Sequence, residues 1–224
     1  MSNSVPQAVS HQAYPATFSV DYQEKLSRVT TLFRSILIIP IAFILGIVAS
    51  GPQSVLIVIN DQGEFAPGTT NTGTGILWSL FAATLFMILF RKRYPKWWFD
   101  FNVGLHRFAV RVVVYFGFLT DKYPSTEDEQ NVHLDVTYPN AQTDLSRGMP
   151  LVKWFLAIPH YFILAFLWVA VFGVTVVAWI VVIITGRYPR GLFDFVVGVL
   201  RWSWRVQAYA FVLATDKYPP FSLN

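Results

Sequence analysis

The sequence predicts an all-α integral membrane protein built from two tandem repeats. Apolar residues make up 54% of the 224-residue chain, the mean hydropathy is +0.46, and several sequence blocks occur twice in the same order. Charged residues are only 13%, whereas water-soluble domains carry about a quarter. Because so few charges cannot cover a water-exposed surface, we expect the apolar excess to face lipid.

Short blocks at matching positions define the two repeats. Leu-Ser-Arg precedes the first apolar span of each unit, at residues 26–28 and 145–147, and Asp-Lys-Tyr-Pro closes the unit, at residues 121–124 and 216–219. Between them lies a Phe-Asp-Phe block followed by two arginines. The predicted division is a polar tail at 1–13, repeat one at 14–124, a linker at 125–131, repeat two at 132–219 and a tail at 220–224.

Each repeat is expected to contain four elements. First comes a strand-like segment with alternating side chains, at residues 16–22 and 132–138. Two apolar transmembrane helices and an amphipathic helix follow. The apolar spans are expected at 31–49 and 76–90 in repeat one and at 150–171 and 174–185 in repeat two, and the amphipathic helices at 96–119 and 190–214.

One insertion distinguishes repeat one. Residues 51–75 have no counterpart in repeat two, are rich in Gly, Thr, Asn and Pro, and contain no Lys or Arg. This composition predicts an external loop, and its SVLIVIN stretch is compatible with a short strand.

Repeat two leaves little room for a transmembrane hairpin. A helix needs about 20 residues to cross the roughly 30 Å hydrocarbon layer. Residues 151–185 must supply both helices, which implies a short turn near Phe172 and Gly173. The alternative is a hairpin that dips into the membrane without crossing it. Pro40 and Pro159 fall inside the first helix of each repeat, where each is expected to introduce a kink.

The amphipathic helices carry a charged stripe. In repeat one, Asp100, Arg107 and Arg111 share one helix face. We expect these helices to lie in the membrane interface with their charges toward water, because two arginines inside the bilayer are costly. If they crossed instead, the repeats would be inverted, as in many transporters. The matching stripe in repeat two is Asp194, Arg201 and Arg205.

Basic residues flank the apolar spans and predict the topology. If each hairpin enters and returns, all of them face the cytoplasm. Both chain ends and both strand segments then lie on the cytoplasmic side of the inner (plasma) membrane, where the strands could pair. The candidate residues for binding anionic lipid or a partner are Arg91, Lys92, Arg93, Lys96, Arg107, Arg111, Arg187, Arg190, Arg201 and Arg205.

No pattern of catalytic residues is present in the sequence. The chain has no cysteine, and its four histidines form no close metal-ligand pair, so we predict no catalytic residue, metal site or cofactor. His160 is the candidate polar residue at membrane depth, and a hydrogen bond to a neighbouring helix is its favoured role. No basic stripe interleaved with stacking aromatics lies on a polar segment, which argues against nucleic-acid binding.

Together, the Leu-Ser-Arg and Ile-Pro blocks, the span ending in Arg-Tyr-Pro, the Phe-Asp-Phe helix and the closing Asp-Lys-Tyr-Pro resemble an uncharacterised bacterial membrane family, domain of unknown function 4389. That family occurs mainly in actinobacteria and looks like tandem repeats of this unit. It often has Ile-Pro-His in the first helix, which repeat two keeps at residues 158–160, whereas repeat one has Ile41 in place of the histidine. The resemblance implies an architecture but no established activity.

Two functions are considered. The first is a non-enzymatic multi-pass membrane protein, an accessory or scaffold subunit that binds a larger envelope or respiratory complex, a homo-oligomeric partner or anionic lipid. The second is a small transporter or channel with two inverted three-helix repeats, motivated by the prolines and the Asp–Arg stripes. A membrane enzyme would rest only on His160 and the aspartates.

Overall fold

The computed structural model is mostly helical and describes residues 14–41, 43, 46, 54–59, 65–70, 76–126 and 130–224. Its elements in chain order are β1 (Ala16–Val20), α1 (Arg28–Leu37), β2 (Ser54–Ile59), β3 (Phe65–Thr70), α3 (Ile76–Phe86), the π-helical turn η1 (Met87–Arg91), α4 (Lys96–Phe116), β4 (Val132–Val136), α5 (Met149–Leu156), α6 (Ile158–Thr185) and α7 (Arg190–Ala210).

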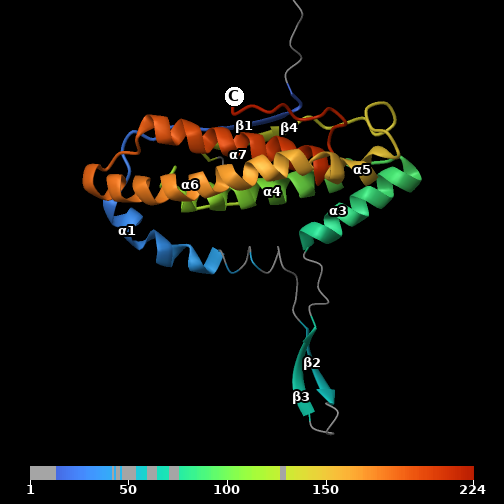
Figure 1. The fold of residues 1–224 in the computed structure, drawn as a ribbon, viewed down its shortest axis with the longest axis horizontal. Helices are drawn as coiled ribbons and strands as arrows, with labels where there is room; N and C mark the ends of the chain where they lie inside the picture. The colour runs from blue at the N-terminus through green and yellow to red at the C-terminus, as the bar shows by residue number, and fades with distance from the viewer. Residues whose placement is uncertain are drawn as a thin grey trace, which may run out of the picture.

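The long helices α4, α6 and α7 run roughly parallel to one another, with the β1–β4 sheet beside α7 (Figure 1). Helix α7 contacts both β1 and α6 and lies between them in Figure 1. Val199, Trp204 and Tyr209 of α7 are among its fully covered side chains. The helix predicted at 190–214 is observed from Arg190 to Ala210. It is a core helix, because most of its side chains are covered by the protein itself, which corrects the expectation that it lies at the membrane interface.

Strands β1 and β4 pair antiparallel, with Phe18 opposite Leu134 at the centre of the register. Both residues point inward and are buried, while Thr17 and Ser19 on the other face of β1 are exposed. This alternation is the pattern from which the two strands were predicted, and their predicted pairing is confirmed. Two strands alone are marginal in water, so the sheet depends on its packing against α7.

The insertion of repeat one contains a second two-stranded sheet. The predicted SVLIVIN strand corresponds to β2, which pairs antiparallel with β3 so that Ile59 lies opposite Phe65. Residues 51–53, 60–64 and 71–75 of the expected external loop lie outside the described residues. Its external position stays a prediction.

The hairpin predicted in repeat two is wrong. Helix α6 is continuous from Ile158 to Thr185 and passes through Phe172 and Gly173 without a turn. One glycine inside a helix costs only about 1 kcal/mol, which a packed apolar helix easily tolerates. The chain has no proline or polar turn residue at this point. The spans expected at 150–171 and 174–185 are therefore replaced by the short helix α5 and the long helix α6.

The prolines mark the start of a helix rather than a kink within one. Helix α5 ends at Leu156, Ala157 forms the junction, and Pro159 lies in the first turn of α6. A proline is tolerated there because it has no N–H to leave unpaired. Repeat one repeats this arrangement: α1 ends before Ile38, and Pro40 lies two residues beyond. The expected span 31–49 is thus divided at Ile38, whereas α3 and η1 together match the span expected at 76–90.

A buried cation ties each first helix to the closing Asp-Lys-Tyr-Pro block. Arg34 of α1 pairs with Asp121, and Lys153 of α5 lies 2.8 Å from the Asp216 carboxylate. Both cationic side chains are completely buried. Each aspartate also accepts a backbone N–H, from Ser27 or Ser146, at 2.7 Å. Burial lowers the pKa of Lys153, and the Asp216 carboxylate opposes that shift.

The helix with the charged stripe in each repeat binds the strand of the other repeat. The Arg201 Nε of α7 donates to the Phe18 carbonyl of β1 at 2.9 Å, and the Arg107 Nε of α4 donates to the Leu134 carbonyl of β4 at 3.2 Å. Each arginine thus binds the strand that belongs, by sequence, to the other repeat. Equivalent sequence blocks therefore make equivalent contacts across the molecule, and the halves interlock.

The buried pairs predict an asymmetric response to removing one carboxylate. Asp216→Asn leaves the buried Lys153 without its counter-ion, and we expect it to lower the free energy of unfolding by about 3 kcal/mol. Asp194→Asn is the matched control, because Asp194 is exposed and pairs with Arg190 at 3.4 Å on the surface. It should change stability by less than about 1 kcal/mol. Thermal unfolding in detergent, followed by tryptophan fluorescence, measures both; equal effects would contradict the assignment.

Candidate functional site

The arginines of the charged stripes bind the chain itself. Arg201 also donates to the Leu223 carbonyl at 2.9 Å, and the buried Arg205 donates to the Ser222 carbonyl at 3.3 Å and to that of Asn224. Arg111 donates to the Ser125 carbonyl at 2.6 Å. These guanidinium groups therefore hold the strands and the segments after the helices in place, which is a structural role for residues predicted as lipid or partner ligands.

The aspartates of the stripes lie outside this network. Asp100 pairs with Lys96 at 2.7 Å, and Asp194 pairs with Arg190 at 3.4 Å, both four residues apart in the first turns of α4 and α7. All four side chains are more than half exposed. Such surface pairs contribute little to stability, and they form no continuous path of charge with the buried arginines.

The remaining basic candidates form two groups, which we call the cationic ends. One consists of Arg91, Lys92, Arg93 and Lys96, and the other of Arg187 and Arg190. Tyr94, inside the first group, donates to the Val212 carbonyl at 2.9 Å, beyond the C-terminal end of α7. Gly186, beside the second, accepts the Leu26 N–H at 2.9 Å, near the start of α1. The two cationic ends therefore lie at opposite ends of α7 and of its neighbour α6.

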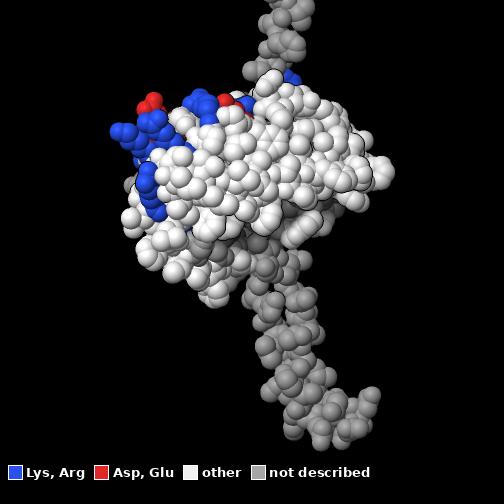
Figure 2. Space-filling view, turned by 60° about the vertical axis from the view of Figure 1, so that its left-hand side comes forward, with Lys and Arg blue, Asp and Glu red and all other residues white. Residues whose placement is uncertain are grey.

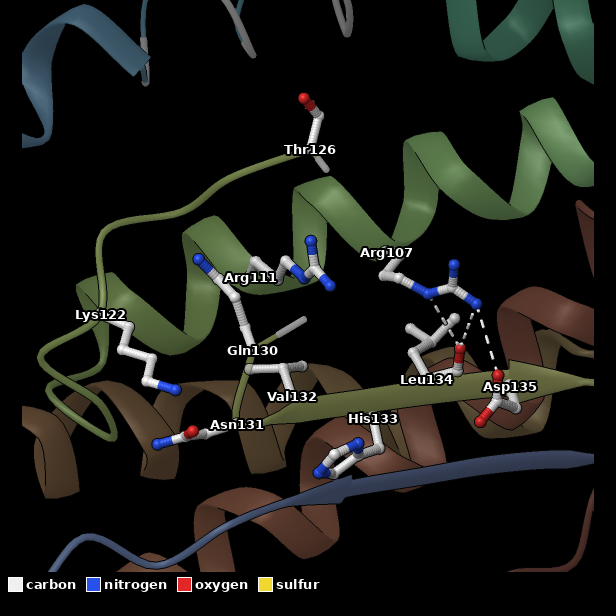
Figure 3. Close-up of a pocket in the computed structure, with 10 residues that line it drawn as sticks. All are labelled: Arg107, Arg111, Lys122, Thr126, Gln130, Asn131, Val132, His133, Leu134 and Asp135. Atoms are coloured by element: carbon white, nitrogen blue, oxygen red, sulfur yellow. Dashed lines mark hydrogen bonds and ion pairs between the residues drawn. The ribbon is translucent and has the colours of Figure 1, made fainter. Parts of the chain in front are cut away.

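A polar pocket of about 550 Å³ lies between α4 and β4 (Figure 3). Three of its lining residues are cations, and Asp135 is the acid among those described. The pocket therefore favours anionic oxygens, such as those of a carboxylate or phosphate. Sequence reasoning identified Arg107 and Arg111 but not Lys122 or His133, because only the return of β4 along α4 brings these together. The lining residues are Arg107, Arg111, Lys122, Thr126, Gln130, Asn131, Val132, His133, Leu134 and Asp135.

His160 is fully buried at the start of α6. Its Nδ1 accepts a hydrogen bond from the Trp202 indole N–H of α7 at 3.1 Å, and its ring stacks on Phe221 with centroids 4.0 Å apart. The hydrogen bond to a neighbouring helix is thus the one favoured from the sequence. No group of acidic or histidine residues that could hold a metal ion occurs among the described residues.

The outer side of α6 is an exposed apolar strip. Phe162, Phe166, Val169 and Phe172 are all more than 60% exposed, whereas Val171, on the inner side, is buried. Within the described parts of the chain, α6 is the helix long and apolar enough to cross a membrane. Figure 2 shows a broad surface without charge, with Lys and Arg gathered mainly at its upper left and along its upper edge. The helices α1 and α5, which contact α6, carry further exposed apolar residues: Val29, Leu32, Phe33 and Ile36 of α1, and Leu151, Val152 and Phe155 of α5.

A protein-family model matches part of the second half of the chain. Residues 149–222 match the model of the family described as domain of unknown function (DUF4389). The match spans α5, α6, α7 and the closing Asp-Lys-Tyr-Pro block, so the resemblance found from the motifs is confirmed for this part of the chain. Comparisons with curated proteins and with solved structures gave no match.

The hydrogen bond between His160 and Trp202 predicts that replacing His160 lowers the free energy of unfolding. His160→Leu removes the acceptor of the Trp202 N–H, and an unpaired buried donor costs about 1–3 kcal/mol. His160→Gln is the control, because its side-chain oxygen can accept the same hydrogen bond. Unfolding in detergent should show a larger loss for His160→Leu. Equal stability of the two variants would show that this hydrogen bond has no structural importance.

Proposed function

We propose that the protein is a non-enzymatic membrane protein, an accessory or scaffold subunit held in the bilayer by the apolar strip of α6 with its neighbours α1 and α5. The exposed phenylalanines of α6 support this proposal most directly. Burying one such side chain away from water is worth about 1.5–3 kcal/mol, so lipid is a far better environment for this strip than water. In this proposal the cationic ends contact anionic lipid headgroups or an acidic membrane partner.

The absence of enzymatic activity is part of the proposal. Asp121 and Asp216 are engaged by Arg34 and Lys153 and by backbone N–H groups. The His106 Nδ1 lies 2.9 Å from the Asn102 carbonyl within its own helix, and burial lowers the pKa of this histidine. Among the described residues, these arrangements favour structural roles for the groups that acid–base catalysis would need.

The proposed location is the inner (plasma) membrane with the chain ends on the cytoplasmic side. The number of crossings proposed here differs from the sequence expectation of four. By length and apolar composition, α6 is the single candidate span among the described residues, and the shorter apolar segment Ile76–Arg91 falls below that length. The attachment proposed here therefore relies on an apolar surface rather than on a bundle of four crossing helices.

The accessory role is preferred to transport. The transporter hypothesis was motivated by kinked helices and by charged stripes inside the membrane. The prolines lie instead at helix starts, and Arg107 and Arg201 are hydrogen-bonded to strand carbonyls. Both features therefore have structural explanations that do not involve transport. The proposed partners are a larger membrane complex, a second copy of the chain and anionic lipid. Nucleic acid is not proposed as a partner.

Membrane attachment through α6 is testable by substitution. In Phe166→Asn/Phe172→Asn/Val176→Asn, the outer strip loses much of its apolar surface, and we expect a large fraction of this variant to leave the membrane pellet during an alkaline carbonate wash. The matched control, Thr17→Asn/Ser19→Asn, changes the exposed face of β1 and should stay in the pellet. Immunoblots of pellet and supernatant give the result. Release of the unmodified protein by carbonate would overturn the proposal.

The cationic ends predict bound anionic lipid. We expect protein purified in mild detergent to retain anionic phospholipid, at about 1 kcal/mol of attraction per nearby charge. Arg93→Gln/Lys96→Gln/Arg187→Gln/Arg190→Gln should reduce the retained amount several-fold. Mass spectrometry of the extracted lipid measures it, and a 1 M salt wash, which screens exposed charges, should remove the difference. An unchanged lipid content in the variant would exclude the cationic ends as the binding region.

A further inference from the structure

We propose that α6 lies along the membrane rather than across it, so that both of its ends and the β1–β4 sheet face the same aqueous side. This inference rests on the membrane attachment proposed above and adds an orientation to it. Three observations lead to it: the position of the polar sheet, the charges on that sheet, and the charges at both ends of α6.

The polar sheet lies across the molecule from the middle of α6. Trp168, near mid-length of α6, donates its indole N–H to the Ser203 hydroxyl of α7 at 3.2 Å. Two residues earlier in α7, Arg201 donates to the centre of β1 at Phe18. The order from lipid inward is therefore α6, then α7, then β1. If the bilayer normal followed the α6 axis, the sheet would lie near the bilayer midplane.

The outer face of the sheet is unsuited to that depth. His133 and Asp21 lie 3.1 Å apart with both side chains more than half exposed, and the Asp135 side chain is 75% exposed. A charged residue at the bilayer centre costs about 2.5–3.5 kcal/mol on insertion scales. A two-stranded sheet also has two open edges, and lipid offers no partner to backbone groups there other than the carbonyls that Arg107 and Arg201 bind. With α6 lying flat, this face is in water.

Both ends of α6 are positively charged. Arg187 and Arg190 follow its C-terminus. Arg91, Arg93 and Lys96 lie near its N-terminal end, because Tyr94 binds Val212 and the neighbouring Phe211 packs on Tyr161 of α6. A crossing helix would place one of these cationic ends outside the cell, against the preference of Lys and Arg for the cytoplasmic side. A flat α6 places both at one interface. Exposed Trp97 and Trp154 suit the same interfacial position.

The chain contains no cysteine, so single introduced cysteines report sidedness directly. Gly148→Cys lies at the start of α5 in open space, and Thr185→Cys lies at the end of α6. Ser19→Cys reports the sheet and Phe172→Cys the apolar strip. Each variant is labelled with a membrane-impermeant maleimide in right-side-out and in inverted vesicles. If Ser19→Cys or Phe172→Cys does not match the unmodified protein in size-exclusion chromatography, Thr17→Cys or Phe166→Cys, respectively, replaces it.

We expect the cysteines at residues 148, 185 and 19 to label only from the cytoplasmic side, and the one at residue 172 to label only after detergent is added. Labelling of residues 148 and 185 from opposite sides would overturn the orientation while leaving membrane attachment intact. Failure of residue 19 to label in either vesicle type would also overturn it. Release of the unmodified protein by carbonate would instead refute the proposed function itself, so the two failures are distinguishable.

Discussion

The apolar outer strip of α6 constrains the rest of the molecule, because in the proposed membrane-attached protein it leaves one long side unavailable to charged groups. Its exposed side chains are mostly phenylalanines and β-branched residues over the length of the helix, α6 contains no Asp, Glu, Lys or Arg, and His160 is buried. All other polar groups must then be placed elsewhere. They gather at the cationic ends, on the outer face of the β1–β4 sheet and in the pocket beside α4. The same constraint explains why so few charges suffice for a chain of this length.

Buried and half-buried cationic side chains join segments that are far apart in sequence. Arg201 connects α7 to β1, and Arg107 connects α4 to β4. Arg34 and Lys153 anchor the first helices to the closing aspartates. A buried cation without its partner is strongly destabilising, whereas an intact pair contributes little net energy. These contacts therefore fix the arrangement of the two halves more than they add to its stability, and the duplicated sequence blocks are the residues that form them.

Much of the fold was predictable from local patterns, and the failures have physical causes. Alternating residues predict β1 and β4, and their shared predicted side of the membrane suggests that they pair. The antiparallel pairing of Phe18 with Leu134 confirms this. The apolar run 151–185 was misread, because composition alone cannot distinguish one long helix from two short ones. Arg201 and Arg205 were read as facing water, since the carbonyls that accept their hydrogen bonds come from distant segments. The pocket with Lys122 and His133 was missed for the same reason.

The most direct test of the account is the behaviour of the purified full-length chain when detergent is removed, with and without liposomes. The exposed strip of α6 predicts that the protein floats with liposomes in a density gradient and forms large aggregates when lipid is omitted. Its helical content, measured by circular dichroism, should be preserved only in the liposome sample. A folded, monodisperse protein in detergent-free buffer would contradict the account, because the apolar strip would then be stable in water.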